Sequence, residues 1–502
     1  MVVEAARSRP AAAAASLGDL AQDRHRFWKK RVLLTGEADT LETGNGAVCL
    51  DASLRLLTRL CPNMVVALPP ECASLREASR AVADRIWFGQ PVEFDDGAEP
   101  AVGFDAILNI GSRVRPDLPW TAINSNGWLA RVSSVRTGLS SQCRQANPIG
   151  ALLAASLGAA EVFKRLISLK PERGDLWDGL TFSSWTYECG GEDPGAALPQ
   201  RLDLEALLVG AGAIGNGILY LLSSLPLGGQ LWVVDRDDFK DENLGTCLLI
   251  GPHDLQAAKA TFAQAYLVKR LSVVGYPEKL STFKNRLDTE IPYPRIVLGA
   301  VDSIPSRHEL QDLWPDIIID GAIGDFSCQV SRHPWGEDLA CLRCLFREPS
   351  GPSAELVQTR ATGLPVEVLR DGEAVLTEDH VQAAREDKRN FLRARLGQRI
   401  CAVAAEGVAH QLSREQQDQT FQPSLPFVAC ASSAMLVGEV VKRCAGWTTR
   451  LDGRFQFDLL VGPQAGKQFP QSRRADCVCV TRAANIAKVQ ARRREARPVS
   501  GS

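Results

Sequence analysis

Three glycines and an aspartate have the spacing of a nucleotide-binding turn. Gly210, Gly212 and Gly215 follow an apolar run in the order G-x-G-x-x-G. This spacing lets a strand turn tightly into a helix whose first amides face a phosphate. A second apolar run ends at Asp235, about 20 residues after the last glycine, where a carboxylate can accept hydrogen bonds from ribose hydroxyls. The same motif occurs in NAD- and FAD-dependent enzymes and among packed glycines that bind nothing.

Cysteines are the second group of residues that could do chemistry. Cys341 and Cys344 have the C-x-x-C spacing that lets two thiolates from one turn bind zinc. A lone pair is equally a redox or a packing feature. Fourteen cysteines in 502 residues are too few for a dense disulfide framework, so metal ligands, nucleophiles and small core residues are the alternatives.

The composition predicts a soluble protein. The chain of 54.5 kDa is 45% hydrophobic and 23% charged, which is material for about three domains. Its 57 basic and 59 acidic residues leave a net charge of -2, so no nucleic-acid or membrane-surface partner is expected. Apolar runs of about 18 residues and a signal-peptide pattern are absent, so we expect a cytoplasmic location.

The first third of the chain alternates predicted strands and helices. Strands are expected at 32–36, 64–68, 104–110 and 120–132, with helices over 54–60 and 74–86. Repeated βαβ order predicts a mostly parallel sheet with helices on both faces. The glycine motif is lost after Gly36, and no acid ends the second strand, so this half looks like a nucleotide fold without its nucleotide.

An internal repeat indicates that the fold occurs twice. Residues 148–165 match residues 426–443 without a gap, and both segments open with Pro and close with E-x-x-K-R. AILNIGS, ending at Ser112, similarly matches IVLGAVDS, ending at Ser303. The predicted order is a disordered tail (1–18), a first domain (19–169), a linker (170–203), a second domain (204–350 and 415–483) with an insertion (351–414), and a disordered basic tail (484–502).

Five segments in a fixed order resemble a known family. After Asp235 come DENLGTCLLIGPHDLQAAKATFAQAYL, IVLGAVDSIPSRHELQ, IIIDGAIGDF, ACLRCLF and DCVCV. This order resembles the ubiquitin-activating and ThiF/MoeB adenylating family over about 205–350 and 415–480. The resemblance implies an α/β fold of two tandem Rossmann-like, ThiF-type doubly wound sheets with a helical insertion. The first sheet would be degenerate and the second would bind the nucleotide.

The resemblance implies an ATP site with magnesium. Amides between Gly210 and Gly215 would hold phosphate, and Asp235 would hold the ribose. Asn243 and Lys259 match family positions that face the phosphates, with Lys259 stabilising the transition state, and Asp302 would hold Mg²⁺. From the residues alone, Lys259 is equally a solvated side chain on an amphipathic helix, and Asp302 an acid that ends a strand.

One departure from the family concerns an arginine. The family has N-x-x-R where this chain has Asn243 followed by Leu244, Gly245 and Thr246, and a hydroxyl cannot replace a guanidinium fork. The segment DRHRFW at 23–28 is similar to the D-R-Q-x-R-x-W that opens the inactive halves of two-headed ubiquitin-activating enzymes. Arg24 is therefore expected to supply a positive charge from the first copy.

The resemblance also assigns roles to cysteines. It implies that Cys341, Cys344, Cys477 and Cys479 hold a structural Zn²⁺, although the second pair is spaced C-x-C. Cys401 is our choice for a thioester-forming residue, because it precedes a helical pattern and a helix N-terminus favours thiolate. The other candidates are Cys430, which aligns with Leu152 of the repeat and so reads as core, and Cys328.

The leading hypothesis is ATP-dependent activation of a small ubiquitin-like protein by C-terminal adenylation. The ubiquitin-like protein would then be transferred to a cysteine of this chain as a thioester, and from there to a conjugating (carrier) enzyme. High Ala and Arg usage suggests a bacterial genome, where such proteins resemble members of conjugation operons linked to antiphage defence. The alternatives are adenylation for sulfur transfer or peptide modification, an NAD-dependent oxidoreductase, and a pseudoenzyme scaffold. The two copies predict a monomer-like pseudo-dimer or a homo-oligomer.

Overall fold

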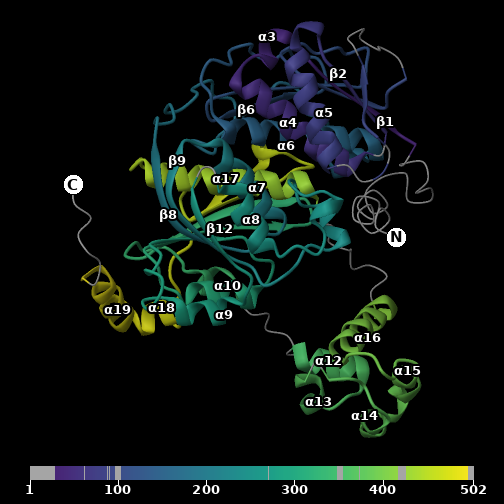
Figure 1. The fold of residues 1–502 in the computed structure, drawn as a ribbon, viewed down its shortest axis with the longest axis vertical. Helices are drawn as coiled ribbons and strands as arrows, with labels where there is room; N and C mark the ends of the chain where they lie inside the picture. The colour runs from purple at the N-terminus through teal and green to yellow at the C-terminus, as the bar shows by residue number, and fades with distance from the viewer. Residues whose placement is uncertain are drawn as a thin grey trace. The chain divides into compact units, whose positions relative to one another are not determined.

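Two sheets, of seven and eight strands, build the larger part of the chain (Figure 1), and their first seven strands follow the same order. The computed structural model describes residues 29–61, 63–86, 89, 91–95, 103–268, 271–347, 354–371, 374–415 and 425–495. Met1–Arg347 and Gln422–Ser502 form one compact unit, and Glu348–Phe421 forms another.

The first sheet has the order β3-β2-β1-β4-β5-β6-β7. Strands β1 to β5 pair in parallel, whereas β6 and β7 join antiparallel. Every residue of β4 and β5 is buried, as expected for strands inside the sheet with both faces covered. The strands are β1 (Arg31–Gly36), β2 (Asn63–Ala67), β3 (Glu93–Asp95), β4 (Ala106–Ile110), β5 (Trp120–Asn126), β6 (Leu129–Ser133) and β7 (Leu180–Ser183).

The second sheet repeats this arrangement in the order β10-β9-β8-β11-β12-β13-β14-β15. Its strands β8 to β12 are parallel and β13 to β15 are antiparallel. The shared order confirms the predicted tandem α/β fold. Its strands are β8 (Leu202–Val209), β9 (Leu227–Val234), β10 (Ser272–Tyr276), β11 (Ile296–Gly299), β12 (Ile317–Gly324), β13 (Ser327–Pro334), β14 (Arg454–Asp458) and β15 (Lys467–Phe469).

The helices also follow the repeat, and the first sheet with its helices is termed the first copy, the second sheet with its helices the second copy. Among the described helices, none has both the length and the hydrophobicity that a membrane span needs. The first copy has α3 (Ala38–Leu41), α4 (Gly44–Leu60), α5 (Ala73–Ile86) and α6 (Pro148–Ile167); the second has α7 (Ala213–Ser224), α8 (Lys259–Leu267), α9 (Leu280–Phe283), α10 (Ile304–Gln311), α11 (Leu342–Leu345), α17 (Pro426–Cys444), α18 (Val478–Thr481) and α19 (Ala483–Glu495).

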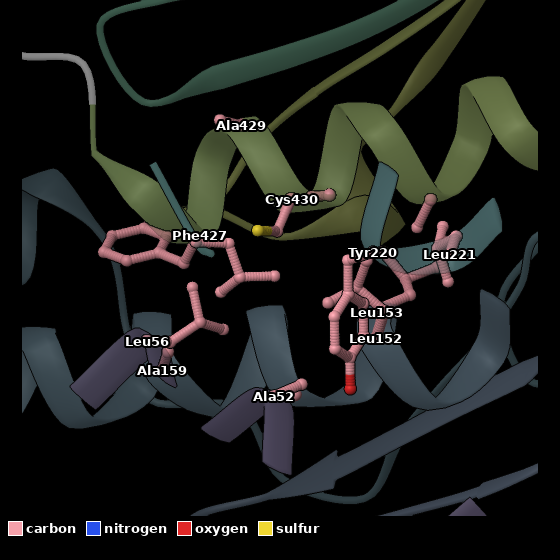
Figure 2. Packing of buried hydrophobic residues seen from close by; sticks show 14 of the residues in the cluster. Ala52, Leu56, Leu152, Leu153, Ala159, Tyr220, Leu221, Phe427, Ala429 and Cys430 are labelled. Atoms are coloured by element: carbon pink, nitrogen blue, oxygen red, sulfur yellow. The ribbon is translucent and has the colours of Figure 1, made fainter. Parts of the chain in front are cut away.

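A single hydrophobic core joins the two copies. Helices α4 and α6 of the first copy pack against α7 and α17 of the second. Figure 2 shows Leu56 and Leu152 facing Phe427 and Cys430 across this boundary, with Tyr220 beside them. Because α6 and α17 are rich in small residues, their backbones can approach closely and bury both helices almost completely.

The repeated E-x-x-K ending of α6 and α17 forms a buried ion pair in each helix. Glu161 lies 2.6 Å from Lys164, and Glu439 lies 2.8 Å from Lys442. Burial lowers the pKa of both lysines. Lys442 also donates to the carbonyl of Ser184 at 2.9 Å, so the second helix holds the connection between the copies.

Two segments differ from the sequence-based expectation. The predicted linker 170–203 contains β7, which pairs with β6 and buries Phe182 against Phe455. The strand is only four residues long, too short for its alternation to stand out from the surrounding Gly, Pro and Trp residues. The expected linker is therefore in part an edge of the first sheet.

The predicted disordered tail 484–502 contains most of helix α19. Its Gln490 is buried and donates to the carbonyls of Trp314 and Pro315, both at 3.0 Å. Arg493 lies over the ring of Tyr293, 3.3 Å from its centre. Few apolar residues mark this helix, since polar side chains make the contacts that dock it. The predicted tail 1–18 and residues 19–28 of the predicted first domain lie outside the described residues.

The smaller unit spans the predicted insertion 351–414, and its described part is helical. It has α12 (Ala354–Thr362), α13 (Val366–Arg370), α14 (Glu378–Ala383), α15 (Arg389–Arg393) and α16 (Ile400–Glu415). Leu376, Val381, Leu392 and Ile400 share its own small core.

Glu439→Ala is expected to lower the free energy of unfolding by roughly 3–5 kcal/mol, because it leaves the buried Lys442 ammonium without a carboxylate. Urea denaturation followed by tryptophan fluorescence measures this. The matched control is Asp203→Ala, whose ion pair with Arg201 is exposed and should contribute less than about 1 kcal/mol. Equal losses in the two variants would contradict a stabilising buried pair.

Candidate functional site

The glycine turn follows β8, at the point between β8 and β11 where the chain stops adding strands on one side of the second sheet and begins on the other. Gly210 has φ 93°, and a Cβ there would lie 2.4 Å from the carbonyl oxygen of Ala300, so only glycine fits. A Cβ at Gly215 would meet the Gly210 carbonyl oxygen, also at 2.4 Å. Open α/β sheets bind ligands at such a switch point, beyond the carboxyl ends of the strands.

Gly212 differs from the other two glycines because the described residues leave space for a side chain there. Its φ is -73°, and a Cβ there would meet no atom within 4 Å. Gly212 is the N-cap of α7, and no side chain caps this helix end. Among the described residues, no side chain therefore accepts from the first amides of α7, and a phosphate can use such amides.

Asp235, at the end of β9, is bound to the glycine turn itself. Its Oδ2 accepts a hydrogen bond from the Ala211 amide at 2.7 Å, and its Oδ1 accepts one from the Asp237 amide at 2.9 Å. Burial raises the pKa of Asp235 above its ordinary value. Each carboxylate oxygen keeps a further acceptor position, so Asp235 both orients the turn and can accept from a ligand hydroxyl.

Lys259 begins α8 beside the same turn. Its Nζ lies 3.8 Å from Oδ2 of Asp237, and its charge opposes the burial-driven rise in the pKa of Asp235. Lys259 therefore lies close enough to Asp235 for its charge to act on the carboxylate that holds the glycine turn. At 3.8 Å the ion pair with Asp237 is loose, so the ammonium keeps donors for an anionic ligand.

Asn243 and Thr246 lie in the turn that leads to α8. The side chain of Asn243 accepts from the Lys240 amide at 2.8 Å, so it shapes its own turn. Thr246, at the position of the absent arginine, is buried, and its hydroxyl donates to the Asn243 carbonyl at 3.4 Å. Thr246 thus serves the turn and offers no cation.

Asp302 is exposed in the connection from β11 to α10. The same connection contains Ala300, whose carbonyl lies against Gly210. Arg307, five residues further on, pairs with Asp320 of the I-D-G strand at 3.0 Å in the interior. The D-S-x-x-x-R segment therefore has one exposed carboxylate near the turn and one buried structural arginine.

The equivalent position in the first copy is filled by the chain. Glu37 follows β1, and its carboxylate accepts from the amides of Ser112 at 3.1 Å and Arg113 at 2.8 Å, just after β4. Thr43 caps α4 by accepting from the Gly46 amide at 2.9 Å. Both observations explain in physical terms why this copy looks like a nucleotide fold without a nucleotide.

Four cysteines from two distant segments form a buried cluster. Sγ of Cys341 lies 3.7 Å from Sγ of Cys344 and 3.7 Å from Sγ of Cys477, and Cys344 lies 3.6 Å from Cys479. Four thiolates around a tetrahedral zinc ion at 2.3 Å would lie about 3.8 Å apart, so the cluster fits this ion. Cys341 and Cys477 each precede a short helix, which is how the C-x-C pair joins the C-x-x-C pair.

The three candidates for a reactive cysteine lie in different environments. Cys401 is exposed in the first turn of α16, in the smaller unit. Cys430 is buried in α17, and burial raises the pKa of its thiol to about 12. Cys328 is buried in β13, with its pKa also raised by burial. Arg24 lies outside the described residues.

Two residues of this region were not predicted from the sequence. Glu37 belongs to no recognisable motif. Its position directly after a predicted strand and Gly36 was the available signal that it could accept from amides at this edge of the sheet. Asn216 follows Gly215 and donates to the carbonyls of Ala211 and Gly212, at 2.9 and 3.1 Å. Its place directly after the last glycine of the motif was the available signal.

Comparison with known proteins gives one relative and a set of solved structures. An uncharacterized protein of Sinorhizobium fredii, y4jF, is 27% identical over 442 residues, which cover 84% of this chain and 82% of the relative. Crystal structures of Escherichia coli MccB show a TM-score of 0.35. The complex with MccA and AMPCPP is 14% identical and the complex with ATP is 13% identical; they cover 55% and 56% of this chain. The match spans 66% of the MccB chain, just under two thirds of its length.

A family model also matches the chain. The ThiF family model covers residues 198–479, more than half of the sequence. The match begins just before β8, takes in the glycine turn, Asp235, Lys259 and Asp302, and ends at Cys479. This match supports ATP-dependent adenylation as the class of activity. The chain belongs to the ThiF family.

Proposed function

We propose that the chain adenylates the C-terminal carboxylate of a small ubiquitin-like protein at the glycine turn of the second copy. The observation that carries this proposal is the open space in front of Gly212 at the uncapped start of α7. In the first copy, by contrast, the side chain of Thr43 caps the start of α4, and Glu37 accepts from the amides after β4. Within the described part of the chain, no side chain caps the start of α7, so its amides can bind an anion.

The surrounding residues fit a triphosphate with magnesium. Amides of the turn would hold phosphate, and Asp235 would accept from the ribose while keeping the turn in place. Lys259 would neutralise charge that develops at the α-phosphate, and Asp302 would hold Mg²⁺. A carboxylate oxygen of the partner protein would attack the α-phosphorus, and the bond to pyrophosphate would break to give an acyl adenylate.

The second step of the proposal is transfer to Cys401. The Cys401 thiolate would attack the acyl carbon and release AMP, and the resulting thioester would pass to a carrier enzyme. Exposure of Cys401 at the first turn of α16 supports this choice over the buried Cys430 and Cys328. A role in bacterial antiphage defence belongs to the same proposal.

Lys259→Ala and Arg24→Ala are each expected to abolish AMP transfer to the ubiquitin-like protein, because each removes a cation that would neutralise charge on the phosphates. ATP-pyrophosphate exchange with magnesium measures the step. The control is Arg201→Ala, which removes an exposed cation directly before β8. This variant should show normal ATP-pyrophosphate exchange. Normal exchange in Lys259→Ala would contradict its assignment, and NAD binding without exchange would favour an oxidoreductase.

Cys401→Ser is expected to trap the ubiquitin-like protein as an oxyester that resists thiols, whereas the wild type should form a thiol-sensitive adduct. Intact-mass spectrometry after incubation with ATP and magnesium distinguishes the two. Cys189→Ser, which changes an exposed cysteine elsewhere, should behave like the wild type. A thioester that still forms in Cys401→Ala would exclude this residue, and adenylation without any adduct would favour the sulfur-transfer or peptide-modifying alternative.

Cys341→Ser is expected to reduce bound zinc from one ion per chain to almost none, since a three-thiolate site loses affinity. Elemental analysis of the purified chain measures this, with Cys189→Ser as the control. The cluster ties α18, and the adjoining α19, to the core, so limited proteolysis should cut more readily within 472–495. Zinc-free wild-type protein with the same protease resistance would contradict a structural zinc site.

A further inference from the structure

The segment 246–250 of the second copy has an unusual position. All five of its residues are buried, and it continues directly from the Asn243 turn. It begins at Thr246, where the phosphate-binding arginine is absent, and leads toward Lys259. Because the segment touches no solvent, interior contacts must decide where the neighbouring site residues lie.

A side chain of the first copy holds this segment. Arg59, in the last turn of α4, donates from Nε to the carbonyl of Cys247 at 2.6 Å and from Nη2 to the carbonyl of Ile250 at 2.8 Å. Its Nη1 donates back to the carbonyl of Arg55 at 2.8 Å, which anchors the guanidinium to its own helix. One planar group thus fixes two carbonyls of the other copy.

The guanidinium of Arg59 is held by carbonyl groups of the backbone. Among the residues that the structure describes, no carboxylate pairs with it, although its exposed fraction is 1%. Burial lowers the pKa of Arg59 to about 9, so it remains charged at neutral pH. Burying a cation in this way is costly, and an apolar side chain would fill the same space at less cost. What the guanidinium adds over an apolar side chain is a fixed orientation of the two carbonyl groups to which it donates.

Asn216 connects the same segment to the glycine turn. Its Oδ1 accepts from the Leu249 amide at 3.2 Å, and its Nδ2 donates to the carbonyls of Ala211 and Gly212. Its side chain is fully buried in the first turns of α7. Hydrogen bonds at both ends, joined by the backbone of 247–250, therefore connect Arg59 through Asn216 to the glycine turn.

A second contact between the copies acts on the end of this segment. A Cβ at Gly251 would lie 2.0 Å from the carbonyl of Arg85, in the last turn of α5. The backbone of the second copy therefore passes directly against a helix end of the first copy. This close approach leaves little room for the segment to shift.

We propose that Arg59 is a positioning residue for the nucleotide site of the second copy, acting through residues 246–250 and Asn216 on the glycine turn. The first copy, whose own switch point Glu37 fills, would then set the geometry of the site in the other copy. This inference rests on the proposed function for the identity of the ligand, but not for the hydrogen-bond path itself.

The test compares Arg59→Met, Arg59→Lys and Asn216→Leu in the full chain. Hydrogen exchange, read by mass spectrometry over 208–216 and 246–250, reports on the path without any ligand. Isothermal titration with a non-hydrolysable ATP analogue and magnesium reports on the site. We expect Arg59→Met to speed exchange in both segments and to weaken analogue binding on the order of tenfold, the size typical of changes along such networks. Arg59→Lys should recover part of both losses.

Arg131→Met is the matched control. Arg131 has the same exposed fraction of 1%, but it donates to the Gln142 carbonyl and to Glu192, within the first copy and its connector. It should leave exchange at 208–216 and analogue binding unchanged. Unchanged exchange at 208–216 in both Arg59→Met and Asn216→Leu would overturn the proposal, as would an effect of equal size in Arg131→Met.

A wild-type chain that binds no analogue would contradict the proposed function, and the exchange measurement alone would then decide on Arg59. Lys259→Ala separates the two questions further. It should abolish analogue binding while leaving exchange at 208–216 close to the wild type, because it removes no hydrogen bond between Arg59, Asn216 and the glycine turn. Should Arg59→Met fail to fold, Asn216→Leu and Arg59→Lys carry the same two readouts.

Discussion

The packing of α6 against α17 is the contact on which both copies depend. Each helix is apolar on nearly every side, and a helix of this kind must lie between two layers rather than cover one. Sheet contacts bury one face of each helix, and the helix of the other copy buries the opposite face. Separating the copies would expose both faces to water, so the two sheets form one folding unit.

Within this unit, two sheets of equal topology meet the same electrostatic demand in different ways. At each switch point, main-chain amides need an acceptor. The first copy supplies Glu37 and Thr43 from its own chain. The second copy supplies Asp235 for one amide of the turn and leaves the start of α7 uncapped. In the first copy, side chains of the protein accept hydrogen bonds from these amides. In the second copy, the amides at the start of α7 can take a ligand as their acceptor.

The parts of the fold that could be predicted from the sequence are those with a repeating physical signal. Apolar runs marked the strands β1, β2, β4 and β8, and the matched E-x-x-K helices marked the duplication. Strand β7 and helix α19 were missed because a four-residue strand and a helix docked by Gln490 and Arg493 carry little apolar periodicity. Local pattern predicts elements well only where burial of apolar side chains positions them.

The candidate site was predictable where side-chain type carries the chemistry. Glycine spacing predicted the turn, and its geometry requires glycine at Gly210 and Gly215. The approach of Cys341 to Cys477, 136 residues apart, followed only from the family resemblance, since spacing cannot join separate segments. The contacts of Arg59 could not be predicted at all, because its partners are carbonyls that every residue possesses.

The carboxylate of Glu37 has a consequence for how the molecule responds to its surroundings. A tethered acceptor is present at an effective concentration that no freely diffusing anion matches, so the amides after β4 stay satisfied whether nucleotide is plentiful or scarce. Only ligand-dependent surfaces gain stability from their ligand. The amides after β4 are thus independent of any ligand, whereas a ligand bound at the glycine turn would stabilise the shared folding unit through the second copy.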